Sequence, residues 1–569
     1  MDPAQHARRR HHSSQEHAAP REVAGSHAEL NSVHQQEQPD EKREGFARIY
    51  GSLSPWKAGV ISKCAMLATV LKKNWAQYGH TGMGSAIGTG LMIGSGRTLA
   101  VGGPTAIMVS YALVGFTVYL VLSALGEVAA WIPQPSTVAD QAFRFCDPAL
   151  GFALGWIYWM KYAVITANQL TAATLVMALW LSPHDINPGI WITIFLVLIT
   201  AINYIRHTLP SKIEFYVSTI KLIVMSGLMI LSLVLVLGVR PNHRTMGFQY
   251  RFQPGVAVRS KDGIGVFFRT CGALSSATFA YIGSERSGIL ARSPNVPQAM
   301  NRAIKYTFYR IVVFHLVGIT LLGLILPYRT VSSFVFRSTA GKLAASPFVA
   351  ALIVAGIAVL PHILNGCLLL FVLSIAAYDL FLATAALSDL ALRKRAPMVL
   401  SRVNRNGVPV YALAVSVMVA SWAYVNVSSD SSVVFGYLVD LVTMLGLLTW
   451  ISILITHICF VRARKVQGIP DRILVFRARF GLAGTWLALA LCVFISSTMI
   501  FNSLPIRDHK IHFDVTKFLA SYVGIPVYVT LYLGHRIILQ SKHINPRDAD
   551  FWSDRQIPTT PENELQPLA

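Results

Sequence analysis

Charged residues are scarce in this sequence. Of its 569 residues, only 13% are Asp, Glu, Lys or Arg, whereas 53% are hydrophobic. Soluble domains carry about 25% charged residues, and a soluble chain of this length would form about three or four domains whose surfaces need that charge. The scarcity excludes a multidomain soluble protein, and the apolar content excludes a disordered one.

Motifs for metals, disulfides and nucleotides are also missing. The six cysteines are scattered without a CxxC pair, so neither a metal site nor a disulfide framework is predicted. No P-loop pattern occurs, which argues against an ATP-driven pump. No grouping of Ser, His and Asp matches a catalytic motif. We therefore expect a protein that is not an enzyme and has no cofactor.

Acidic residues are the rarer sign of charge, with 27 Asp and Glu against 49 Lys and Arg, a net charge of +22. An excess of this size can indicate nucleic-acid binding. Here the basic residues lie in short clusters between apolar runs and form no continuous basic face. The pattern favours a membrane protein with positive cytoplasmic loops, so no nucleic-acid partner is expected.

Apolar runs long enough to cross a bilayer fill most of the chain, since about 20 residues span the hydrocarbon. Residues 1–79 are polar, without the apolar core of a signal peptide, and predict a disordered cytoplasmic tail. Residues 80–540 predict an all-α membrane domain of twelve helices, and 541–569 a second cytoplasmic tail. The twelve runs are centred in 80–100, 105–131, 149–180, 189–205, 213–238, 264–290, 307–328, 354–384, 409–426, 433–461, 481–502 and 516–539. Residues 346–391 exceed one span and predict a short outer helix before the eighth.

Loop charges predict the orientation. The loops after the eighth and tenth runs are rich in Arg and Lys, whereas those after the third and ninth have none. With an even number of spans, both termini then lie in the cytoplasm. The loop after the fifth run is basic yet falls outside, and it is long enough to be translocated despite its charge.

Glycine is concentrated in the first apolar run, over Gly82–Gly96. Each glycine lowers helix propensity by about 1 kcal/mol relative to alanine, so the centre at Gly88-Thr89-Gly90 predicts a helix that opens. Broken backbone at membrane depth lines a cavity or protein, where its N–H groups can bind a ligand. The alternative is that these glycines only allow helices to pack closely.

The sixth run, Ser275–Gly288, contains a second candidate break. Paired interrupted helices in corresponding halves of a transporter indicate a midplane site. A half-helix N-terminus favours a carboxylate, and unwound carbonyls accept from an ammonium. Two such breaks suit a zwitterion such as an amino acid.

These segments resemble a known family, the fungal amino-acid permeases of the amino acid–polyamine–organocation superfamily. The resemblance covers about 80–530 in order and spacing, and it rests on Ser85–Gly96, Gly103-Pro104, Leu125-Gly126-Glu127 and Asp147–Trp156. Further segments are similar to the dicarboxylic (acidic) amino-acid permeases, namely Asn168–Ala173, Pro188–Phe195, Pro241-Asn242-His243, Val359–Ile363 and Asn426–Ser429.

The resemblance implies a five-plus-five inverted repeat with broken helices 1 and 6, two extra helices, and proton-coupled amino-acid uptake across the plasma membrane. With the two breaks, it assigns substrate binding to Ser85, Gly88, Thr89, Gly90, Lys161, Gln169, Phe279, Ala280, Tyr281 and Gly283. Lys161 replaces an asparagine of many relatives, and Gln169 a glutamate. Both changes suit an acidic substrate, and the two residues share one helical face. Structural pairing of Lys161 is the alternative.

Ionisable residues inside spans are expensive and usually functional. By resemblance to bacterial-type relatives, in which a lysine of the fifth span occupies the site that sodium fills elsewhere, Lys221 is the candidate for proton coupling. Glu285 is a candidate gate group or a partner of Arg286, and Glu127 a candidate for pairing or gating. Asp440 has no obvious partner in the sequence.

Two cytoplasmic segments depart from the family. Ala291–Pro297 lacks the acidic Gly-Glu-Ala-x-Asn-Pro-Arg-Lys pattern, and Thr384–Ser388 stands in place of Ser-Arg-x-Leu-Tyr. Such groups would hold an inner gate. Two alternatives therefore stay open beside an acidic amino-acid permease: a neutral or general permease, and a non-transporting amino-acid sensor on the same fold.

Overall fold

A computed structural model describes residues 88–553, with gaps at 133–136, 182–185, 207, 238–262, 286–303, 305–306, 310, 327–344, 428–430, 475, 505, 508–509 and 512. The predicted N-terminal tail and the predicted site residue Ser85 lie outside the described residues. Within them the chain is helical, apart from one short antiparallel strand pair. This agrees with the expected all-α class.

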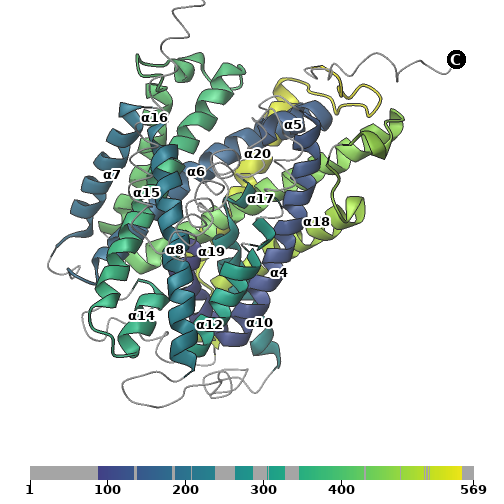
Figure 1. Cartoon of the computed structure of the whole chain (residues 1–569). Coiled ribbons are helices and arrows are strands. Elements are labelled where there is room, and N and C mark those ends of the chain that lie inside the picture. Colours follow the sequence, from purple (N-terminus) through teal and green to yellow (C-terminus); the bar gives the residue numbers. More distant parts are fainter. Residues whose placement is uncertain are drawn as a thin grey trace, which may run out of the picture. The chain divides into compact units, whose positions relative to one another are not determined.

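The elements of the described chain follow one another as a series of helices (Figure 1). In chain order they are η1 (Gly90–Gly94), α4 (Ser95–Trp131), α5 (Val138–Phe145), α6 (Pro148–Met177), α7 (Pro188–Ile205), α8 (Leu209–Val236), α10 (Gly263–Tyr281), η3 (Ile311–Val317), α12 (Gly318–Ile325), α14 (Pro347–Val354), α15 (Leu360–Leu392), η4 (Met398–Ser401), α16 (Val410–Ala420), η5 (Ser421–Val427), α17 (Ser431–Val466), η6 (Asp471–Ile473), α18 (Gly481–Thr498), η7 (Met499–Ser503), β1 (Ile506–Arg507), β2 (Lys510–Ile511), α19 (Val515–Tyr522) and α20 (Gly524–Ile538).

Nine helices in the described part are long and apolar enough to cross a membrane. The first, Gly90–Trp131, covers two of the predicted runs, and Gly103 interrupts it with non-helical backbone before Pro104. The nine therefore account for ten predicted runs. The other two runs form α6 and α10, which are not among the nine.

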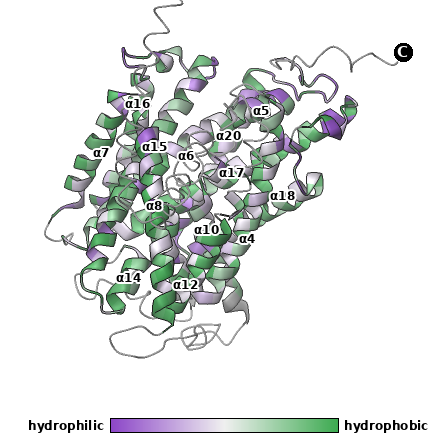
Figure 2. Ribbon diagram, viewed as in Figure 1, coloured by the Kyte–Doolittle hydropathy of each residue, from purple (hydrophilic) through white to green (hydrophobic). Residues whose placement is uncertain are grey.

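Helix α6 lies at the centre of the described helices and packs against α15 and α17. Nearly all of its side chains are buried, polar ones included. By contrast, α7 exposes an apolar stripe that contains Ile190, Ile194 and Val197, and it is largely green in Figure 2. A helix surrounded by protein can carry polar groups that a lipid-facing helix cannot, which explains why α6 has the lower hydropathy.

Helices α10 and α4 pack along one another, and α17 contacts both. Helix α15 contacts α6, α7 and α8, and it is preceded by the short helix α14. A short helix before the eighth span was predicted, and α14 is that helix. These contacts bring η1, α6, the end of α10 and α15 together, and these are the elements that build the site.

The segment that follows α20 packs back onto the ends of the helices. Phe551 is buried against Trp131, Phe145 and Phe460, and its carbonyl accepts from Trp131 Nε1 at 3.2 Å. Arg144 pairs with Asp550 at 3.1 Å. The predicted C-terminal tail thus contributes residues up to Ser553 to the packed body.

Candidate functional site

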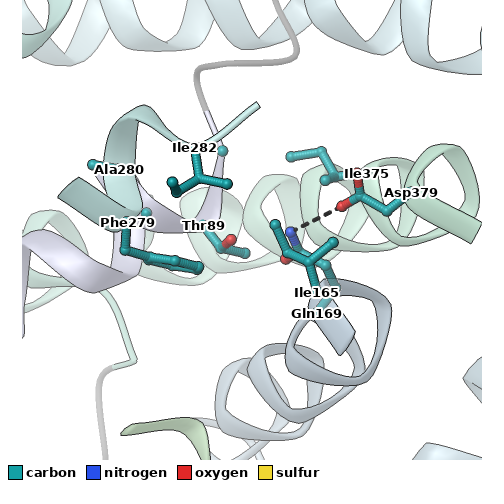
Figure 3. Close-up of a pocket in the computed structure, with 10 residues that line it drawn as sticks. Thr89, Ile165, Gln169, Phe279, Ala280, Ile282, Ile375 and Asp379 are labelled. Carbon is teal, nitrogen blue, oxygen red and sulfur yellow. Dashed lines mark hydrogen bonds between the residues drawn. The ribbon is translucent and has the colours of Figure 1, made fainter. Parts of the chain in front are cut away.

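A small buried pocket lies where η1, α6, α10 and α15 meet (Figure 3). Its volume is about 20 Å³, room for about one water molecule. An amino acid is larger than this, so the lining elements must move apart to admit one. The lining residues are Gly88, Thr89, Gly90, Ile165, Gln169, Phe279, Ala280, Ile282, Ile375 and Asp379.

The glycine-rich segment approaches the end of α10 backbone to backbone. A Cβ built on Gly90 would lie 2.5 Å from Ala280 Cα and 3.0 Å from the Phe279 carbonyl oxygen. No side chain fits at such distances, so Gly90 is required for this contact. Close packing, the alternative to ligand binding, therefore accounts for Gly90, which also lines the pocket.

The polar side chains of the lining come from three elements. Gln169 of α6 donates from Nε2 to Asp379 Oδ2 of α15 at 3.4 Å, and Thr89 lies across the pocket from them (Figure 3). Both Gln169 and Asp379 are buried. The other oxygen of the amide, Gln169 Oε1, is buried and accepts no hydrogen bond from the described residues.

One turn of α6 before Ile165, Lys161 forms a fully buried ion pair with Glu285. The ammonium also faces the rings of Tyr158 and Tyr162, with Nζ 4.3 and 4.5 Å from their centroids. Cation–π contacts of this kind stabilise a desolvated cation. Lys161 thus lies beside the pocket and outside its lining.

The turn after α10 shapes the other half of this pair. Gly283 has φ of 92°, in the left-handed region that favours glycine, and its N–H donates to Glu285 Oε2 at 3.1 Å. Trp450 Nε1 of α17 donates to the same oxygen at 3.2 Å. Glu285 therefore connects α6, the end of α10 and α17.

Lys221 of α8 forms a second buried ion pair, with Glu214 two turns earlier at 2.7 Å. Glu214 also accepts from Ser374 of α15 at 2.9 Å and from Ser218 at 3.0 Å. Lys221 Nζ lies 5.9 Å from the Phe371 ring centroid. This pair lies at the α8–α15 contact, and neither residue lines the pocket.

Glu127 of α4 is buried beside His457 of α17, with 3.4 Å between the Glu127 carboxylate and His457 Nε2. It also accepts from the Ala478 N–H at 2.8 Å. The structure therefore gives Glu127 a partner on α17 and another in the segment before α18, as the pairing alternative expected.

Asp440, left unassigned by the sequence, pairs with Arg97 at 3.4 Å and accepts from Asn502 at 3.2 Å. Asn502 lies beside Gly272 of α10, because a Cβ on that glycine would lie 3.2 Å from Asn502 Oδ1. Gly272 precedes the pocket residue Phe279 by about 10 Å of helix at 1.5 Å per residue. The Arg97 and Lys161 pairs thus lie on opposite sides of the pocket along α10.

The structure brings six of the ten predicted substrate residues together in the pocket lining: Gly88, Thr89, Gly90, Gln169, Phe279 and Ala280. Lys161 and Gly283 meet at Glu285. Tyr281 donates its hydroxyl to the Tyr111 carbonyl at 2.8 Å and stacks on His315, outside the lining. The sequence analysis missed Asp379, although an isolated carboxylate in the apolar run of α15 is a signal that could have found it.

Comparison with known proteins gives the chain its family. The family model for amino acid permeases matches residues 80–543. The dicarboxylic amino acid permease of Saccharomyces cerevisiae is 39% identical, over 85% of this chain and 79% of the relative. An uncharacterized amino-acid permease of Schizosaccharomyces pombe is 36% identical over 82% of this chain and 88% of its own, and the proline-specific permease of S. cerevisiae is 33% identical over 80% and 73%. These relatives are transporters and not enzymes. The chain is a multi-pass membrane protein and belongs to the amino acid permease family.

Proposed function

We propose that this chain imports amino acids, chiefly the acidic ones glutamate and aspartate, across the plasma membrane together with protons. Amino-acid transport follows from the family; the acidic preference, the membrane and the coupling ion are the proposal. The observation that carries it is the buried pocket between η1 and the end of α10. The two segments whose sequences suggested a zwitterion site, far apart in the chain, meet at that pocket.

The proposed architecture has twelve spanning helices in a five-plus-five inverted repeat with two further helices, and both termini in the cytoplasm. The interruption at Gly103 supports counting Gly90–Trp131 as two spans. Helices α6 and α10, whose polar side chains face protein, would supply the remaining two. The basic loops after α15 and α17 support the orientation.

An acidic substrate is supported by the yeast dicarboxylic relative and by the position of Lys161. A second carboxylate in the substrate is costly to desolvate unless it meets a cation. Lys161 lies one turn from the pocket residue Ile165 on the same face of α6, and its present partner is Glu285. In our proposal the side-chain carboxylate of the substrate competes with Glu285 for Lys161 as the pocket enlarges.

Proton coupling is proposed for the Lys221–Glu214 pair. Both groups are buried at the contact of α8 with α15, and α15 also supplies pocket residues. A buried lysine loses its charge more readily than an exposed one. A proton exchanged at this pair would therefore be felt by α15, which moves when the pocket opens.

Two alternatives have different support. A neutral or general permease is favoured by the proline-specific relative, at 33% identity. A non-transporting sensor is favoured by the missing Ser-Arg-x-Leu-Tyr pattern at Thr384–Ser388.

The test is uptake of radiolabelled glutamate, proline and lysine by yeast cells that lack their own amino-acid permeases and express this chain, at pH 5 and pH 7. We expect glutamate uptake that is faster at pH 5 and abolished by a protonophore. Preferred uptake of proline would indicate a neutral permease. Surface-delivered protein that takes up none of the three would favour a sensor, and uptake insensitive to pH and protonophore would refute proton coupling.

A further inference from the structure

The pocket contains one ionisable side chain among its described lining residues, Asp379 of α15. Its carboxylate is fully buried, and it points toward Gln169 across the pocket from Thr89 (Figure 3). The donor that reaches it there is the uncharged Gln169 amide, at 3.4 Å. Hydrogen bonds between nitrogen and oxygen are usually 2.7–3.2 Å long, so this contact leaves the carboxylate open to a closer donor.

The charges nearest to the pocket are already paired. Glu285 holds Lys161, and Glu214 holds Lys221, so each pair contributes no net charge. Within the described lining, no cationic side chain accompanies Asp379. The pocket wall therefore carries a carboxylate, which favours a cationic group of the ligand and disfavours an anionic one.

The adjacent amide has a complementary property. Gln169 Oε1 is buried, and the described residues give it no donor. An ammonium has three N–H donors, and a ligand ammonium between the two residues would satisfy both Asp379 and Gln169 Oε1. Charged donor–acceptor pairs form the shorter and stronger hydrogen bonds in proteins.

We propose that Asp379 binds the α-ammonium of the substrate, with Gln169 as its second acceptor. This inference rests on the proposed function in one respect, that an amino acid occupies this pocket. It assigns a specificity: the protein selects ligands with a primary ammonium over carboxylic acids of the same shape that lack it. The side-chain carboxylate of an acidic substrate then points away from α15, toward Lys161.

The experiment compares glutamate with glutarate, which is glutamate without its amino group. Binding of both is measured on purified full-length protein by titration calorimetry for the wild type, for Asp379→Asn and for Asp379→Ser. Asp389→Asn is the matched control, because Asp389 lies on the same helix, outside the pocket, and pairs with Arg393 at its end.

We expect the wild type and Asp389→Asn to bind glutamate at least tenfold more tightly than glutarate. In Asp379→Asn and Asp379→Ser, glutamate affinity should fall at least tenfold while glutarate affinity stays the same or rises. An equal loss for both ligands, or a wild type that does not distinguish them, would overturn the proposal. So would failure of both neutral variants to fold, because Asp379 would then hold the protein together.

Failure of the proposed acidic specificity would look different. The wild type would then bind a neutral amino acid and not glutamate. The same comparison would be made with alanine and propionate, and the expected collapse of discrimination in Asp379→Asn would be unchanged.

Discussion

Lys161 and Glu285 are 124 positions apart in the chain and form one buried ion pair beside the pocket. Each was predicted from the sequence as a separate functional residue, Lys161 for the substrate and Glu285 for a gate. Their contact makes the two roles interdependent: Lys161 cannot bind a substrate carboxylate fully without releasing Glu285. Release would also loosen the connection that Glu285 makes to Trp450 of α17.

A first prediction separates the pair from the substrate. Lys161→Gln alone leaves Glu285 buried without its cation, and breaking a buried pair in this way costs about 3–5 kcal/mol. We expect reduced thermal stability of the purified protein and poor delivery to the cell surface.

Combining Lys161→Gln with Glu285→Gln removes both charges and should restore stability and delivery. If Lys161 binds the substrate, the double variant should take up glutamine while glutamate uptake falls at least tenfold, about 1.4 kcal/mol of binding energy. Equal uptake of both amino acids would show that Lys161 serves only the pair.

A second prediction concerns Gly90. Gly90→Ala places a Cβ 2.5 Å from the Ala280 backbone, which cannot give way as a side chain could. We expect the end of α10 to be displaced, with uptake reduced at least tenfold and lower thermal stability. Gly94→Ala is the control, since its nearest neighbour is a Phe279 ring carbon at 3.4 Å, an ordinary contact. Equal behaviour of the two variants would contradict the close approach.

A third prediction concerns proton coupling. Lys221→Met together with Glu214→Gln removes the second buried pair without leaving an unpaired charge. We expect labelled glutamate to exchange across the membrane while its accumulation no longer depends on external pH. The ratio of internal to external glutamate at pH 5 and pH 7 measures this. Accumulation with the pH dependence of the wild type would show that the proton travels elsewhere.

A fourth prediction concerns two thiols, those of Cys146 after α5 and Cys459 on α17, whose Sγ atoms are 3.0 Å apart. A disulfide needs about 2.05 Å, so a mild oxidant such as diamide should link them with little movement. The hydrogen bond with Cys459 and burial both raise the pKa of the Cys146 thiol. Since the thiolate is the reactive form and its fraction increases with pH, cross-linking should be slow at pH 7 and faster at pH 9.

The cross-link is detected by mass spectrometry of the oxidised protein, and we expect it to inhibit uptake by fixing α17 to the start of α6. Cys146→Ser should abolish both the link and the inhibition. Cys492→Ser, at a buried cysteine elsewhere, should change neither. Inhibition that persists in Cys146→Ser would assign the oxidant effect to another group.

The sequence by itself determined where most helices lie. Apolar runs of span length are imposed by the bilayer, because each backbone polar group must be satisfied within its own segment. The runs that became α7, α15 and α17 could therefore be read locally. The glycine-rich Gly88–Gly90 segment was also visible, since repeated glycine in an apolar run disfavours a regular helix.

The tertiary structure decided which polar groups meet. Periodicity placed Lys161 and Gln169 on one face of α6, but Lys161 lies against Glu285 and Gln169 against Asp379, and both partners belong to distant helices. The energy of a buried charge depends on its desolvation and its partner. Both are set by helix packing over more than a hundred residues, so the roles of Lys161 and Asp379 follow from the fold.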